Sequence, residues 1–118
     1  MSDARQPGFR KKGDDRPIRA RLERDGKIVP LTDDDGDLFT AIWFRMAPAE
    51  NSLGPTVVAA ADADPERGFV TYQPAPEDVA TAGVFRVEIS VTWIDSDLGT
   101  ETFPGDGYAS LVIVETLA

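Results

Sequence analysis

Alternation of apolar and polar side chains is strongest between residues 85 and 93. Every second position there is large and apolar, and every intervening position is polar; the apolar set is Phe85, Val87, Ile89, Val91 and Trp93. Side chains of a β-strand point alternately to opposite faces, whereas a helix would scatter these five around its axis. The pattern therefore predicts one long strand with a single face in the core.

Shorter stretches of the same kind occur on both sides of this strand. They predict strands at 18–22, 27–31, 40–46, 56–61, 69–73, 100–103 and 108–114. Turn residues separate them, including Asp25-Gly26 and the segments 32–37, 48–55 and 95–99, and Pro104 to Gly107 forms either a kink or a second turn. One helical turn is expected within 74–81, because Pro76 is followed by two acids.

Seven or eight short strands with frequent turns predict an all-β, antiparallel sandwich. The segment 78–87, DVATAGVFRV, resembles the corner that enters the penultimate strand of immunoglobulin-like domains. Phe85 stands where that corner usually has tyrosine, so the hydroxyl hydrogen bond of the corner is expected to be absent. We therefore predict an immunoglobulin-like β-sandwich over residues 17–118.

Residues 1–16 differ from the rest in composition and charge. They hold Arg5, Arg10, Lys11, Lys12 and Arg16 against three aspartates, a net charge of +2 in a chain of net charge −9. Phe9 is their single large apolar residue after Met1, so we predict an extended basic N-terminal arm with order beginning near Pro17. The arm is either a solvated tail or a contact with an acidic neighbour.

The acidic body and the missing residue types exclude several functions. A net charge of −9 disfavours nucleic acid and anionic membrane as partners. No apolar stretch is long enough for a membrane span or a signal peptide. Histidine and cysteine are absent, so the five serines lack the usual base, and no nucleotide-binding motif occurs. We predict a protein without catalytic residues or cofactors.

The run TDDDGD invites a calcium interpretation through Asp33, Asp35 and Asp37. Aligning Gly36 with the invariant glycine of an EF-hand loop places Leu31 and Ile42 at ligand positions, where neither can bind calcium. A looser metal site, shared with Asp95 and Asp97 or with Asp62 and Asp64, stays open as a weaker alternative to a solvated turn.

The two tryptophans differ in phase. Trp93 is in register with the predicted core face, whereas Trp43 is out of register with Ile42 and Phe44 and points away from the core, near Arg45. An exposed tryptophan on a sheet is a candidate contact for a protein partner or a sugar ring. The alternative is that the loop 49–55 or the N-terminal arm covers it.

Several motifs occur in a familiar order. They are Gly13 to Ile18, Asp25-Gly26, Pro30 to Thr32, Thr40 to Met46 (TAIWFRM), Thr81 to Phe85 and Glu101 to Tyr108 (ETFPGDGY). In this order the chain resembles small phage and prophage virion proteins that are similar to the N-terminal immunoglobulin-like domain of the phage baseplate upper protein family. The resemblance runs from about Gly13 to Val114, with an insertion between Thr32 and Thr40 and without the long helical region of that family.

The resemblance implies a non-enzymatic bacteriophage structural protein, made in the host cytoplasm and located in the virion. Its partners would be capsid, neck or tail and baseplate subunits, in many symmetric copies. The candidate partner-binding residues are Arg5, Phe9, Arg10, Lys11, Lys12, Trp43 and Arg45. The alternative function is a carbohydrate-binding or adhesion module that uses Trp43 with Tyr72 or Tyr108.

Overall fold

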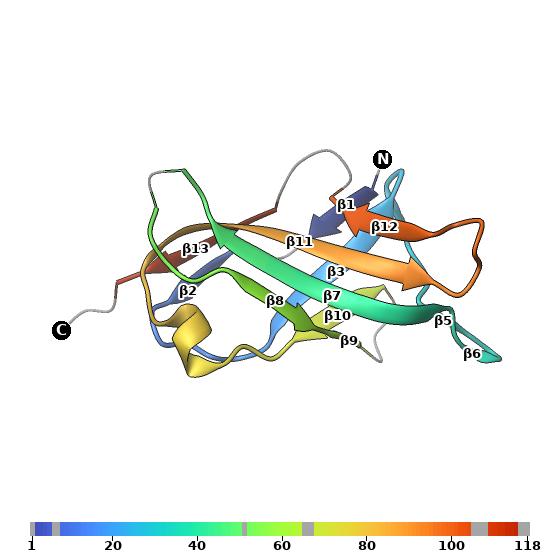
Figure 1. The fold of residues 1–118 in the computed structure, drawn as a ribbon, viewed down its shortest axis with the longest axis horizontal. Helices are drawn as coiled ribbons and strands as arrows, with labels where there is room; N and C mark the ends of the chain where they lie inside the picture. The colour runs from blue at the N-terminus through green and yellow to red at the C-terminus, as the bar shows by residue number, and fades with distance from the viewer. Residues whose placement is uncertain (1, 6–7, 51, 65–67, 105–108, 116–118) are drawn as a thin grey trace.

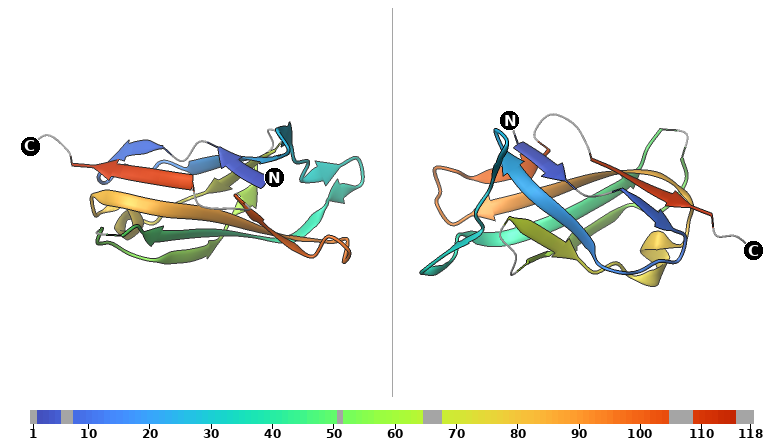
Figure 2. Two further views of the ribbon diagram at one scale, coloured as in Figure 1. Left: turned by 90° about the horizontal axis from the view of Figure 1, so that it is seen from above. Right: turned by 180° about the vertical axis from the view of Figure 1, so that it is seen from behind.

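The protein is a β-sandwich whose long axis measures 50 Å (Figure 1). The computed structural model describes residues 2–5, 8–50, 52–64, 68–104 and 109–115. Two main sheets pack face to face, and the buried apolar residues of both form one cluster between them (Figure 2). The predicted all-β class is confirmed.

The first sheet has the strand order β1-β3-β10-β9, and the short strand β4 pairs with β3. Its strands are β1 (Ser2–Arg5), β3 (Ile18–Arg24), β4 (Lys27–Ile28), β9 (Asp62–Ala63) and β10 (Phe69–Tyr72). All its pairs are antiparallel.

The second sheet has the order β2-β13-β11-β7-β8, with β12 also paired to β11. Its strands are β2 (Phe9–Lys11), β7 (Phe39–Pro48), β8 (Val57–Ala60), β11 (Gly83–Trp93), β12 (Thr100–Phe103) and β13 (Ala109–Val114). Strand β11 is central, because β7 runs along one edge while β12 and β13 share the other.

Two small elements complete the chain. A separate hairpin joins β5 (Thr32–Asp33) to β6 (Gly36–Asp37), within the segment predicted as a loop. The 3-10 helix η1 (Pro76–Val79) is the single turn expected within 74–81. The described residues form thirteen strands rather than seven or eight, because short edge segments add to the predicted ones. The predicted turn at Gly105 to Gly107, and Tyr108, lie outside the described residues.

The predicted N-terminal arm is part of the sandwich. Strand β1 pairs antiparallel with β3 in the first sheet, and β2 pairs parallel with β13 in the second. The expectation that order begins near Pro17 is therefore wrong, as is that of purely antiparallel pairing. An edge strand presents unpaired backbone N–H and C=O groups, and these accept a polar segment as readily as an apolar one.

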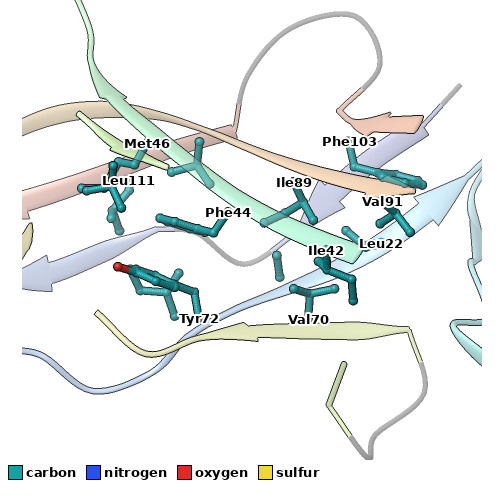
Figure 3. Packing of buried hydrophobic residues seen from close by; sticks show 14 of the residues in the cluster. Leu22, Ile42, Phe44, Met46, Val70, Tyr72, Ile89, Val91, Phe103 and Leu111 are labelled. Atoms are coloured by element: carbon teal, nitrogen blue, oxygen red, sulfur yellow. The ribbon is translucent and has the colours of Figure 1, made fainter. Parts of the chain in front are cut away.

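The alternating pattern of β11 determines the core as predicted. Phe85, Val87, Ile89, Val91 and Trp93 are all buried. They belong to the same cluster as core residues of the first sheet, which include Leu22, Val70 and Tyr72 (Figure 3).

The two sheets are joined by an aromatic stack. The ring of Phe44 on β7 lies 4.3 Å from that of Tyr72 on β10, with 10° between their planes (Figure 3). The hydroxyl of Tyr72 donates a 2.6 Å hydrogen bond to Asp78 of η1, which also accepts one from the backbone N–H of Ala75. Tyr72, on the strand before β11, thus provides the hydroxyl hydrogen bond that Phe85 cannot form.

Candidate interaction surfaces

The outer face of the second sheet exposes an aromatic side chain. Trp43 points away from the core, as predicted, and 40% of its surface is exposed. Its neighbours in register are Ser90 on β11 and Ala60 on β8, both too short to cover an indole. Next to them Val58 is 59% exposed. Together Trp43 and Val58 form a small apolar patch, and an exposed aromatic side chain is enriched at binding surfaces.

Charged residues lie beside this patch. Arg45 is opposite Glu88 on one side and Val58 on the other. A shallow cavity of about 290 Å³ lies here, and Arg45, Val58, Arg86 and Glu88 contribute to its lining. Predicted contact residues Trp43 and Arg45 thus share one face, on the same strand.

A second apolar row crosses the same sheet near its other edge. Val84 on β11 is in register with Val112 on β13, and Val112 with Phe9 on β2. The neighbouring Phe85 and Leu111 point into the core, so this row faces outward. Phe9 is the most open, with 81% of its surface exposed.

The outer face of the first sheet is different, because its charged side chains pair with one another. Arg19 lies 3.2 Å from Asp64, which also accepts a 2.8 Å hydrogen bond from the hydroxyl of Thr71. Arg21 pairs with Glu23 at 2.9 Å. The guanidinium of Arg19 also lies 4.2 Å above the ring of Phe69, which is only 6% exposed.

The basic residues of the N-terminal segment are partly engaged within the chain. The guanidinium of Arg10 donates hydrogen bonds to the carbonyls of Asp14 (2.8 Å) and Arg16 (2.7 Å), and burial lowers its pKa. Lys12 lies 3.5 Å from the carboxylate of Glu115. Hydrogen bonds from Arg16 lower the pKa of Asp14 to about 2. The Arg10 guanidinium therefore stabilises the loop that follows β2 through these two carbonyls.

Lys11 and Arg5 are the remaining predicted contact residues of the N-terminal segment. Lys11 is exposed on the edge strand β2, beside Phe9. The side chain of Arg5 lies outside the described residues, although its backbone pairs with Arg21.

Three of the four aspartates of the TDDDGD run line one groove. Asp33, Asp35 and Asp37 line a groove of about 430 Å³ together with Asp95. Within the described part of the chain, no three acidic residues stand close enough to hold a metal ion. A carboxylate oxygen of Asp33 instead accepts the backbone N–H of Asp35 at 2.8 Å. The geometry is that of an ordinary turn, and it does not assemble the metal site considered from the sequence.

Apolar side chains form the remaining wall of this groove. They are Val29, Pro30, Leu38, Trp93, Ile94 and Leu98. Arg24 also lines it, but its guanidinium is held by the carboxylate of Glu101, which accepts the indole N–H of Trp93 at 3.1 Å as well. Sequence reasoning missed this groove; the available signal was the pair of apolar residues, Ile94 and Leu98, in a segment otherwise typical of a turn.

The structure does not assemble the aromatic pair proposed for sugar binding. Tyr72 is buried, stacked on Phe44 and bonded to Asp78, whereas Trp43 lies on the opposite side of β7. The expectation of a platform from Trp43 with Tyr72 is therefore wrong, and Tyr108 lies outside the described residues.

In the described ranges, no helix has the length and apolar character needed to cross a membrane. Comparison of the chain with protein-family models, curated proteins and solved structures finds no match.

Proposed function

We propose that this chain is a non-enzymatic structural protein of a bacteriophage particle. It is an immunoglobulin-like module that attaches to neighbouring virion proteins through the outer face of its second sheet. The order of the sequence motifs, from the start of β3 to the end of β13, suggests this class of protein. The observation that carries the proposal is the exposed pair Trp43 and Val58 on the outer face of the second sheet.

The strand order supports the immunoglobulin-like assignment. In that fold one sheet has the order A-B-E-D and the other contains C, F and G. Here β1, β3, β10 and β9 take the places of A, B, E and D; β7 and β11 take those of C and F, and β12 with β13 that of G. The edge strand β8, next to β7, is in the position expected for C′, one of the two strands that variable-type domains add.

The two faces support the choice of attachment surface. On the first sheet Arg19 and Arg21 form ion pairs and the Arg19 guanidinium covers Phe69, so among the described residues of its strands Ile28, at 42%, is the one large apolar side chain left exposed. Trp43 and Val58 on the second sheet instead retain apolar surface whose burial would stabilise a complex. A protein present in many symmetric copies attaches through such surfaces and needs no reaction chemistry.

The experiment is incorporation into particles. Tagged protein is expressed during growth of the phage or prophage that encodes it, and gradient-purified particles are analysed by mass spectrometry. Wild type and the control Arg19→Ala, on the outer face of the first sheet, are expected in the particle fraction at equal amounts. Trp43→Ala is expected to be lost from it. Absence of the wild-type protein from purified particles would overturn the proposal.

A second candidate function is carbohydrate binding by Trp43 alone. The short side chains of Ala60 and Ser90 beside it leave the indole open to a sugar ring. Binding on a glycan array that is abolished in Trp43→Ala, together with no incorporation into particles, would favour this function over the first.

A further inference from the structure

The two ends of the long axis differ in charge and shape. The β5–β6 hairpin and the loop between β11 and β12 lie at one end, and β2 lies beside the C-terminal strand β13 at the other (Figure 1). The acidic groove is at the first end and the exposed Phe9 at the second.

The groove is suited to an apolar side chain with a positive charge beside it. Its wall includes Leu38, Trp93 and Leu98, and its volume of about 430 Å³ is in the range of ligand-binding pockets. The four aspartates on its rim form no ion pair within the described residues, and the lining cation, Arg24, is already bound by Glu101. The rim of the groove therefore carries negative charge that no nearby cation of the described residues neutralises, and it surrounds an apolar surface.

Strand β2 carries the complementary groups. Phe9 projects from the edge of the sheet with 81% of its surface exposed, and the exposed Lys11 lies two residues further on the same strand. Residues i and i+2 of a strand point to the same side, so the ring and the ammonium group project together.

We propose that copies of this chain associate head to tail, with the β2 segment of one copy in the acidic groove of the next. Phe9 would lie against Trp93 and Leu98, and Lys11 would face Asp35 and Asp37. Each copy offers one β2 segment and one groove, and both stay available after the opposite contact has formed. A contact of this heterologous type generates rings where its rotation closes and filaments where it does not.

Charge complementarity favours a second copy as the occupant. Two bodies of net charge −9 repel one another, and this contact brings a basic segment of one to the most acidic end of the other. The inference does not depend on the particle role, because the contact can be measured with the purified chain alone.

The first measurement is sedimentation velocity over a range of protein concentrations, at low and at high salt. The wild type is expected to form oligomers that grow with concentration and to dissociate as salt screens the charges. A wild type that stays monomeric up to millimolar concentration refutes the proposal.

The second measurement separates the two halves of the contact. Phe9→Ser combined with Lys11→Ser disables the inserted segment and leaves the groove intact; Leu98→Lys disables the groove and leaves the segment intact. All three positions are exposed, so both variants are expected to fold. Each variant alone should be monomeric, with a dissociation constant raised at least tenfold.

Mixing the two variants provides the decisive result. One intact segment and one intact groove remain between them, so an equimolar mixture should form dimers and nothing larger. The control Asp62→Lys changes an exposed charge away from the contact and should associate as the wild type does. A mixture that stays monomeric, or loss of association in Asp62→Lys, would instead assign self-association to another surface and overturn the proposal.

Discussion

The outer face of each sheet carries an aromatic side chain, and the two side chains differ in exposure. On the first sheet Phe69 lies beneath the guanidinium of Arg19, which in turn is paired with Asp64, and the ring is 6% exposed. On the second sheet Trp43 is flanked by Ala60 and Ser90 and is 40% exposed. Both rings lie on outer faces of the same sandwich, so the difference in their exposure does not come from burial in the core.

The length of the neighbouring side chains decides whether each ring is covered. A long side chain such as Arg19 covers apolar surface with its methylene groups and guanidinium while it pairs with an acid. The short neighbours of Trp43 can do neither. We infer that the first face is adapted to water and the second to another molecule, and the following variants test that division.

The largest effect is expected from Phe44→Ala. Phe44 is next to Trp43 in the chain but points inward, where it stacks on Tyr72. Removing a buried phenyl ring leaves a cavity and costs about 3–5 kcal/mol of unfolding free energy. Urea denaturation measures it, with Phe44→Leu as the milder control. A loss below about 1 kcal/mol would mean that this stack does not hold the sheets together.

Trp43→Ala should weaken binding more than it weakens folding. Its indole is 40% exposed, so the unfolding free energy is expected to fall by only about 1–2 kcal/mol. Binding to particles should weaken by about 2 kcal/mol, or about 30-fold, if Trp43 is a central contact. Pull-down with purified particles measures the binding. Strong destabilisation with unchanged binding would reverse the roles that we assign to Trp43 and Phe44.

Tyr72→Phe tests the hydrogen bond that joins the first sheet to η1. Loss of the bond to Asp78 should cost about 2 kcal/mol near neutral pH, because the acceptor is a mostly buried carboxyl group. Denaturation of Tyr72→Phe beside the wild type measures this cost.

The same tyrosine should make stability depend on pH in the alkaline range. Burial and the bond to Asp78 raise the pKa of Tyr72 to about 12. A folded-state pKa above the unfolded value of about 10 adds stability that is complete below pH 10 and disappears as pH rises toward 12. Tyr72→Phe should lack this component, so the two proteins should converge in stability on alkaline titration. A constant difference in unfolding free energy between the two proteins from pH 9 to pH 12 would contradict this role of Tyr72.

The smallest effect is expected from Arg19→Ala. It removes a partly exposed ion pair and a cation–π contact, together worth about 1 kcal/mol. The uncovered Phe69 should then bind a hydrophobic dye such as ANS more strongly than it does in the wild type. Particle binding should stay unchanged, and a loss of it would place the attachment surface on the first sheet.

The inward faces of the long strands could be predicted from the sequence. Alternation with period two is a local property of an extended backbone, so Phe85 to Trp93 identified both the strand and its buried side. The same rule placed Trp43 outside and Trp93 inside, and Pro76 with its following acids located η1. These predictions hold because each depends on a few neighbouring residues.

The pairing of distant segments was decided by the tertiary structure alone. A free edge accepts the backbone of almost any segment, so nothing in the composition of residues 1–16 indicated that they join both sheets. The groove likewise needs the 32–37 hairpin to meet the 94–98 loop, and Tyr72 became a core residue because Phe44 lies across from it. The sequence by itself determined which side of each long strand is apolar; packing of the two sheets decided which edges, hydroxyls and carboxylates came together.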